Sequence, residues 1–182
     1  MISKHISDKE GRHSNTAIRR GIDNIPNDEQ LANMKVLAEK VFEPLRSWVG
    51  GPIKINSFFR SVELNKAIGG SSRSQHCKGQ AVDLDDTFGH KTNAEMYHYI
   101  KDNLDFDQLI WEFGTDKNPN WLHISWVSHR PNRKKLTIAY KENGRTKYKN
   151  EVQKFAQEQV GRRRRDDYTD GAVRIPVNSA NP

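Results

Sequence analysis

Two histidines and one aspartate are the residues of this chain whose types and positions could hold a catalytic metal. His76 lies in a loop rich in serine and glycine, and Asp83 lies on the apolar stretch that follows, facing away from its apolar neighbours. His123 repeats this pattern on a second apolar stretch. Zinc in catalytic sites takes three nitrogen or carboxylate ligands and leaves a fourth position for water. His76, Asp83 and His123 therefore predict a site for Zn²⁺.

A metal-free interpretation of the same residues stays open. The chain has seven histidines, so a His/Asp/His set arises readily by chance, and both imidazoles could be ordinary hydrogen-bonded side chains. Against this, Asp85 shares a strand face with Asp83, and two carboxylates stacked there repel each other unless a cation pairs with them. Cys77 has no His/Asn partner placed to make it a nucleophile, and we interpret it as a small loop residue.

Two motifs give the chain a family resemblance. Residues 74–83, SQHCKGQAVD, match the signature S-x-H-x-x-G-x-A-x-D, and residues 121–123, WLH, follow downstream. With them the chain resembles the zinc D-Ala-D-Ala carboxypeptidases and L-Ala-D-Glu endopeptidases, which act on bacterial cell-wall peptides and include many phage lysins. Hedgehog signalling domains share the fold of that family. Residues 55–61, INSFFRS, and the glycine pair 69–70 also resemble it, and the resemblance runs from about residue 15 to about residue 127.

The resemblance implies a role for each matching residue. The two histidines and Asp83 become the zinc ligands. Arg60 becomes the arginine that faces the substrate, because a guanidinium suits a carboxylate or a tetrahedral oxyanion. A surface salt bridge is the alternative for Arg60. The resemblance also places Ser74 and Trp121 at the substrate, although Ser74 could instead only form the turn.

The general base is the position where the resemblance is incomplete. Several relatives place an acidic residue three positions before the last histidine, and this chain has Asn120 there, which cannot take a proton from water. Glu112, on the apolar stretch 109–113, is the expected substitute, since hydrophobic neighbours would raise its pKa towards the useful range. Glu112 could instead be a structural carboxylate, Asp85 could be the base, or the protein could be an inactive relative.

An α+β domain must position these residues, with a mainly antiparallel sheet, flanking helices and the hedgehog/DD-peptidase-like arrangement that the resemblance implies. Alternating apolar residues predict strands, and apolar residues at helical spacing predict helices. We expect strands at 53–58, 81–85, 108–113, 121–126 and 136–141. We expect a first helix from Asp28 that Pro44 ends or kinks near Glu43, and further helices at 61–68, 92–104 and 150–160.

Four segments divide the chain. We expect 1–27 to be irregular and packed on the domain, 28–130 to form the zinc peptidase domain, 131–160 to extend it, and 161–182 to be a basic, flexible tail. Residues 129–182 hold 14 Lys and Arg against 6 Asp and Glu, whereas residues 1–128 are slightly acidic, so we assign the net charge of +7 to the tail. The tail is either solvated or contacts an anionic surface. Because its charge peaks in the run 162–165 and not on a folded face with aromatics, nucleic acid is not the expected partner.

Composition excludes several other classes of protein. No stretch approaches 18 apolar residues, so no transmembrane helix is expected. Residues 1–5 lack the apolar region of a signal peptide, which favours synthesis in the cytoplasm. The single cysteine excludes an intrachain disulfide and a four-cysteine zinc site.

The expected function is zinc-dependent hydrolysis of peptidoglycan peptides by a phage-encoded peptidase. The enzyme would act at the cell wall after release from the cytoplasm, or it would be carried in a virion with virion proteins as partners. The alternative is a non-catalytic wall-binding or virion structural protein that retains the same fold. A third hypothesis is a polyanion binder that acts through the basic tail.

Overall fold

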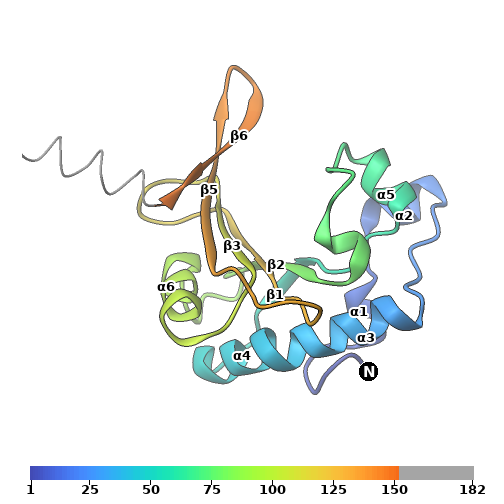
Figure 1. The fold of residues 1–182 in the computed structure, drawn as a ribbon, viewed down its shortest axis with the longest axis horizontal. Helices are drawn as coiled ribbons and strands as arrows, with labels where there is room; N and C mark the ends of the chain where they lie inside the picture. The colour runs from blue at the N-terminus through green and yellow to red at the C-terminus, as the bar shows by residue number, and fades with distance from the viewer. Residues whose placement is uncertain (152–182) are drawn as a thin grey trace, which may run out of the picture.

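The computed structural model describes residues 1–151, which form one sheet with helices around it (Figure 1). The sheet has six strands in the order β1-β2-β4-β3-β5-β6. Neighbouring strands are antiparallel except β3 and β5, which are parallel. The strands are β1 (Lys54–Ser57), β2 (Ala81–Asp85), β3 (Gln108–Glu112), β4 (Trp121–Ser125), β5 (Lys135–Glu142) and β6 (Arg145–Asn150). The expected α+β class with a mainly antiparallel sheet is confirmed.

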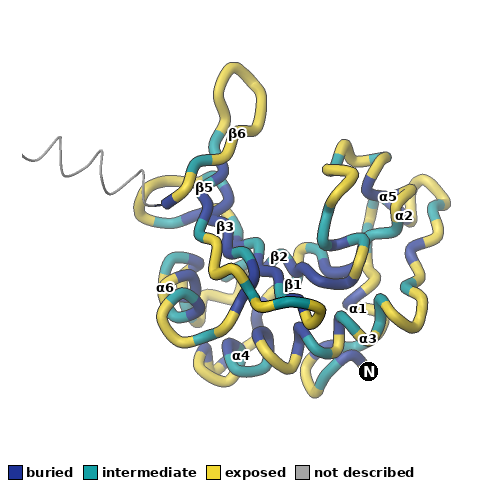
Figure 2. The backbone as a smooth tube through the Cα atoms, viewed as in Figure 1, coloured by how far each residue is buried: buried dark blue, intermediate teal, exposed yellow. Residues whose placement is uncertain are grey.

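The two faces of the sheet differ because side chains alternate along each strand. One face is apolar and buried, and its members on β2, β3 and β4 are Val82, Leu84, Leu109, Trp111, Leu122 and Ile124. This face packs on helices α3 (Asp28–Leu37), α4 (Glu43–Val49) and α6 (Asn93–Asn103) to form the core (Figure 2). The opposite face of the same strands carries the polar residues predicted for the site. The alternation of side chains along each strand therefore separates the core from the site.

One long helix lies along the core and continues past Pro44, the residue expected to end or kink it. Helix α3, the π-helical turn η1 (Ala38–Phe42) and α4 follow one another without interruption, so the helix reaches Val49 and the expectation that Pro44 ends it near Glu43 is wrong. The Glu43 N–H donates to the Ala38 carbonyl, five residues back. This wider turn accommodates Pro44, which has no N–H for an ordinary helical hydrogen bond.

The first 27 residues, which we expected to be irregular, contain two short helices, α1 (Asp8–Gly11) and α2 (Asn15–Arg20). Serine side chains at positions 7 and 14 cap their first turns. Ile2 and Ile6 are 5% and 0% exposed and belong to the core cluster. This segment therefore contributes to the same core as the sheet.

A β-hairpin follows β4 and extends the sheet. Its first strand, β5, corresponds to the strand expected at 136–141, but β6 was not expected because its residues, RTKYKN, lack apolar alternation. Asn143 and Gly144 connect the strands with φ of 51° and 74°, the left-handed pair of a tight hairpin turn. Figure 2 shows the far end of this hairpin exposed. The expected helix at 150–160, beyond residue 151, and the tail at 161–182 lie outside the described residues.

Much of the positive charge that we assigned to the tail lies instead in the folded chain. Eight of the 14 Lys and Arg residues that follow residue 128 fall within 130–149, and five of these belong to β5 and β6. The basic character therefore belongs partly to the sheet. Within residues 1–151, no helix combines the length and the apolar character that crossing a membrane requires.

Candidate metal centre and active-site cleft

The register of the sheet brings two of the predicted metal ligands together. Asp83 on β2 is directly opposite His123 on β4, and the His123 Nδ1 lies 2.9 Å from the Asp83 Oδ1. His76 comes from the 3₁₀ turn η2 (Gln75–Lys78) just before β2. Its Nε2 lies 3.1 Å from the His123 Nδ1 and 3.2 Å from the Asp83 Oδ1. The three atoms thus form a nearly equilateral triangle.

The geometry of this triangle fits a tetrahedral metal ion. Zinc bonds of 2.0–2.2 Å place neighbouring ligand atoms about 3.3–3.6 Å apart, close to the separations of these three atoms. The His76 Nδ1 donates to the Phe58 carbonyl at 2.7 Å, so its Nε2 presents a lone pair to the Asp83 carboxylate. Two electron-rich atoms facing each other need a cation between them. The side chains therefore suit a divalent metal such as zinc.

The charge states of the candidate ligands also fit a metal. Burial lowers the pKa of His76 below its usual value, which favours the neutral imidazole that a metal requires. Burial alone would raise the pKa of Asp83, but the charges and hydrogen bonds of His76 and His123 outweigh it and hold this pKa well below its usual range. Asp83 is consequently a carboxylate at neutral pH.

Helix α3 and one glycine hold the turn that carries His76. The side chains of Gln30 and Asn33 donate to the carbonyls of Cys77 and Lys78 at 3.0 and 2.9 Å. Gly79 ends the turn with φ of 67°, and a Cβ there would lie 2.3 Å from the Gln30 carbonyl oxygen. This position therefore requires glycine, both for its conformation and for the close approach to α3.

Arg60 lies beside the candidate metal centre, on the segment that connects β1 to helix α5 (Val62–Ala67). Its guanidinium Nη2 is 4.0 Å from the Asp83 Oδ2. Asn24 holds the backbone on both sides of Arg60, because its amide donates to the Phe59 carbonyl at 3.1 Å and its oxygen accepts from the Ser61 N–H at 2.7 Å. Sequence reasoning missed Asn24, since no pattern links it to a segment 35 residues away.

Glu112 lies on β3 directly opposite Trp121 and diagonal to His123 on the same face of the sheet. Only 8% of it is exposed. Burial raises the pKa of Glu112 to about 7. The charge of the nearby Asp83 carboxylate also raises this pKa, whereas the charges of His123 and Arg60 lower it. Asp85, the alternative base, is instead engaged with the Thr87 hydroxyl and the Asn93 amide at 3.0 and 3.3 Å.

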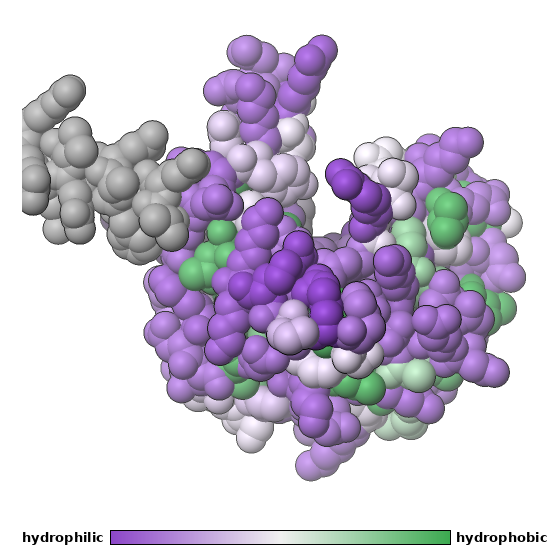
Figure 3. Space-filling view, in the orientation of Figure 1, coloured by the Kyte–Doolittle hydropathy of each residue, from purple (hydrophilic) through white to green (hydrophobic). Residues whose placement is uncertain are grey.

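A cleft of about 670 Å³ runs over this face of the sheet. It is bounded by the arm that carries α5 on one side and the β5–β6 hairpin on the other, and Figure 3 shows a hydrophilic notch between them. All the residues that the sequence singled out as metal-ligating, catalytic or substrate-binding line it: Arg60, Ser74, His76, Asp83, Glu112, Trp121 and His123. The fold therefore brings the whole predicted set to one cleft.

The fold and this cleft agree with the comparison to known families. Residues 4–125 match the Peptidase M15 family, over more than half of the chain. The chain belongs to the Peptidase M15 family. No curated protein matches it. The M15 match ends at the last residue of β4 and contains every predicted site residue, whereas the hairpin that bounds the cleft lies beyond it. Membership in M15 supports a metallopeptidase.

Asn120, where several relatives carry an acid, lies just before β4 in this M15 chain and is exposed. Its backbone N–H donates to the Glu112 carbonyl at 3.0 Å, and its own carbonyl accepts from the Asn93 amide at 3.1 Å. The local role of Asn120 is thus to close the connection between β3 and β4, which fixes Glu112 beside Trp121.

A buried aspartate behind the M15 cleft is a second residue that sequence reasoning missed. Asp107 is 0% exposed and accepts hydrogen bonds from Arg130, from Arg133 and from the amide of Gln75, which precedes His76. Burial would raise the pKa of Asp107, but the hydrogen bonds from the two arginines hold it well below its usual range. Asp107 connects the turn that carries His76 to the segment that enters β5. The separation of these partners along the chain left no sequence signal.

Proposed function

We propose that this M15 protein is a zinc-dependent peptidase that hydrolyses peptidoglycan peptides. The observation that carries the proposal is the triangle of His76, Asp83 and His123 with the buried Glu112 diagonal to it in one open cleft. Zinc would be held by these three side chains and would supply Lewis acidity and an acidified water. Amide hydrolysis needs both, because amides are poor electrophiles and amines are poor leaving groups.

Glu112 is the proposed proton carrier. A carboxyl with a pKa of about 7 can accept a proton from the attacking water and deliver it to the nitrogen of the leaving amine. The position of Glu112, diagonal to His123 on the neighbouring strand, supports this role. The engagement of Asp85 with Thr87 and Asn93 argues against the alternative base.

Three further residues are proposed to bind the substrate. Arg60, beside Asp83, would pair with a substrate carboxylate or with the oxyanion that forms at the scissile carbonyl. Trp121 lines the cleft with its ring 5.3 Å from that of Phe113, which supports packing against a peptide. Ser74 lines the cleft at the start of η2, where its hydroxyl caps no backbone N–H of that turn.

The test of the function is mass spectrometry of purified muropeptides after incubation with the protein, with and without a chelator. We expect new fragments that the chelator abolishes and that zinc restores. Loss of one alanine would identify a carboxypeptidase, and cleavage within the stem or the cross-link would identify an endopeptidase. The absence of fragments from zinc-loaded protein across several wall chemistries would overturn the proposal.

A second candidate is a non-catalytic wall-binding or virion structural protein with the same fold. Asn120, in place of the acid found in several relatives, favours it. Co-sedimentation of zinc-loaded protein with intact sacculi, without turnover, would support this candidate. In either case we propose that a phage encodes the protein and that it reaches the wall after release or in a virion.

A further inference from the structure

The β5–β6 hairpin forms one wall of the cleft although it lies beyond the M15 match. Five of its residues line the cleft, namely Lys135, Thr137, Lys141, Thr146 and Tyr148. The parallel pairing of β3 with β5 places Thr137 beside Ile110 and Ala139 beside Glu112. The hairpin thus adds a wall directly next to the proposed catalytic carboxyl.

Strand alternation divides the charges of the hairpin between its two faces. Lys135 and Lys141 are on the face that lines the cleft. The one acidic residue of the hairpin, Glu142, alternates to the other face, where it pairs with Lys147. Lys141 donates to the Thr146 hydroxyl at 2.7 Å. The charged side chains on the cleft-facing side of the hairpin are therefore all positive.

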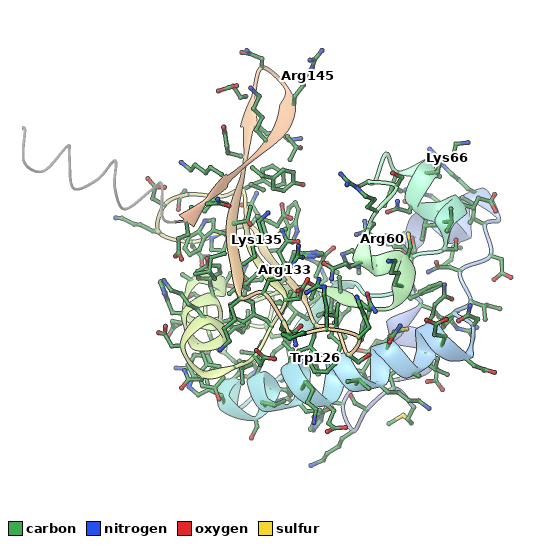
Figure 4. The ribbon with its side chains drawn as sticks, viewed as in Figure 1. Arg60, Lys66, Trp126, Arg133, Lys135 and Arg145 are labelled. Atoms are coloured by element: carbon green, nitrogen blue, oxygen red, sulfur yellow. The ribbon has the colours of Figure 1, made fainter. Side chains whose placement is uncertain are left out.

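The opposite wall of the cleft is also cationic. Arg60 and Arg73 line it, and Figure 4 places Arg60 on the α5 side and Lys135 on the hairpin side. Against these four cations the lining holds two carboxylates, Asp83 and Glu112, both assigned to the metal centre and to proton transfer. The lining therefore has more positive than negative side chains, and this excess positive charge favours an acidic ligand.

Tyr148 adds an aromatic surface beside Glu112. It pairs with Ala139 on β5, and Ala139 pairs with Glu112 on β3, so the small alanine separates the tyrosine from the glutamate. Tyr148 is 58% exposed and lines the cleft, so its ring is accessible to a ligand there. Burial on one side, together with the charges of Glu112 and Asp83, raises the pKa of its hydroxyl. An exposed ring on this wall of the cleft is suited to packing on a peptide backbone.

Three buried polar atoms of the lining residues also point to a ligand. The Thr137 Oγ1, the Arg60 Nε and the Asn65 Oδ1 have no hydrogen-bond partner within residues 1–151. Thr137 is 2% exposed and faces the cleft from the hairpin, while Arg60 faces it from the other wall. Buried polar groups are normally satisfied, so a bound peptide is a natural source of the missing partners.

We propose that the hairpin is a substrate-recognition wall that selects acidic peptides. In this arrangement Lys135 and Lys141 pair with a carboxylate of the substrate, and Tyr148 packs on the adjacent backbone. The inference rests on the proposed peptidase function and adds its specificity. Lysines on an open strand contribute modestly per ion pair, so their effect is on selection between peptides more than on the chemical step.

The test compares two synthetic stem peptides that differ only in whether the D-glutamate α-carboxyl is free or a carboxamide. For the wild type we expect kcat/KM to be roughly fivefold higher for the free acid, with the preference falling as salt is added. The double variant Lys135→Gln/Lys141→Gln should cleave the two peptides equally. Tyr148→Ala should raise KM for both peptides, and Tyr148→Phe should restore it.

Lys149→Gln is the control. It removes one positive charge from the same hairpin, where the test variant removes two, and Lys149 lies on the opposite face, over the Tyr140 ring. We expect it to keep the wild-type preference. Equal cleavage of both peptides by the wild type, or loss of preference in Lys149→Gln, would overturn the recognition wall while leaving the peptidase intact.

Failure of the wild type to cleave either peptide would count against the peptidase and not against the wall. In that case peptide binding tests the recognition role of the hairpin, and it is measured by the fluorescence anisotropy of labelled forms of the two peptides. Tighter binding of the free acid that depends on Lys135 and Lys141 supports the inference, and equal binding overturns it.

Discussion

The candidate metal centre and the β5–β6 hairpin share one face of one sheet, yet they are held in place in different ways. His76, Asp83 and His123 are 1%, 15% and 13% exposed in their side chains, and hydrogen bonds from the Gln30 and Asn33 side chains of α3 fix the His76 turn. Among residues 1–151, the hairpin pairs with the rest of the sheet through β5, and most of β6 is exposed. A firmly held site thus lies next to an exposed hairpin whose residues can change without disturbing that site. Such an arrangement lets substrate specificity change while the chemistry stays the same.

The largest expected effect is in the metal centre. His123→Ala removes one of the three proposed ligands, and since even residues that only orient ligands contribute about 10–100-fold, zinc affinity should fall by more than about 100-fold. We expect loss of bound zinc, measured by elemental analysis after dialysis, together with loss of activity. Full zinc content in the variant would exclude His123 as a ligand. The matched control is His90→Ala, because His90 lies outside the cleft lining.

The next largest effect distinguishes the proposed proton carrier, Glu112, from the proposed metal ligands. Glu112→Gln should keep zinc and lose about 10²–10⁴-fold in kcat, the range that general base catalysis contributes. Because the base must be deprotonated, wild-type kcat/KM should rise with pH through about 7, the pKa that burial gives Glu112. Full turnover in the variant, or a pH profile flat between 5 and 8, would show that another group moves the proton.

The raised pKa of Glu112 also predicts how the free energy of unfolding changes with pH. Its pKa is raised from 4.5 to about 7 on folding, so the folded state holds this proton more tightly and its contribution to stability is lost as pH rises through 7. The difference in unfolding free energy between the wild type and Glu112→Gln should therefore shift in favour of the variant between pH 5 and 8. Denaturant melts at both pH values measure it.

A smaller effect is expected where the two regions meet, at Asp107. Its carboxylate joins Gln75, next to His76, to Arg130 and Arg133 ahead of β5. Asp107→Asn should destabilise the protein by about 2–3 kcal/mol, less than a fully buried ion pair because both arginines are partly exposed.

The pH dependence of this variant has the opposite sign to that of Glu112. The pKa of Asp107 is lowered from 3.8, so its contribution is present above pH 3.8 and is lost as pH falls below it. The stability difference between the wild type and Asp107→Asn should therefore shrink in acid. A constant difference from pH 7 to pH 3 would contradict the role of the carboxylate charge.

The same comparison separates what the sequence could predict from what it could not. The strands of the metal centre alternate clearly, so their bounds, the apolar face and the convergence of the predicted residues followed from spacing and from the M15-like motifs. Asn24 and Asp107 act through partners distant along the chain, and side-chain hydrogen bonds of this kind leave no periodic signal. Strand β6 was not expected because its residues, RTKYKN, lack apolar alternation, and only their pairing with β5 makes them a strand.

The smallest effect should be confined to the hairpin. Gly144 has φ of 74° in the tight turn, a conformation that disfavours a Cβ, while no atom within 4 Å would contact that Cβ. Gly144→Ala should therefore strain the turn by about 1 kcal/mol without disturbing packing. Because the turn is far from the core, we expect faster hydrogen exchange at β6 amides and unchanged exchange at β2 and β4, with zinc content intact. Faster exchange at β2 as well would mean that the hairpin and the metal centre unfold together, and the contrast between a rigid site and a separable wall would be wrong.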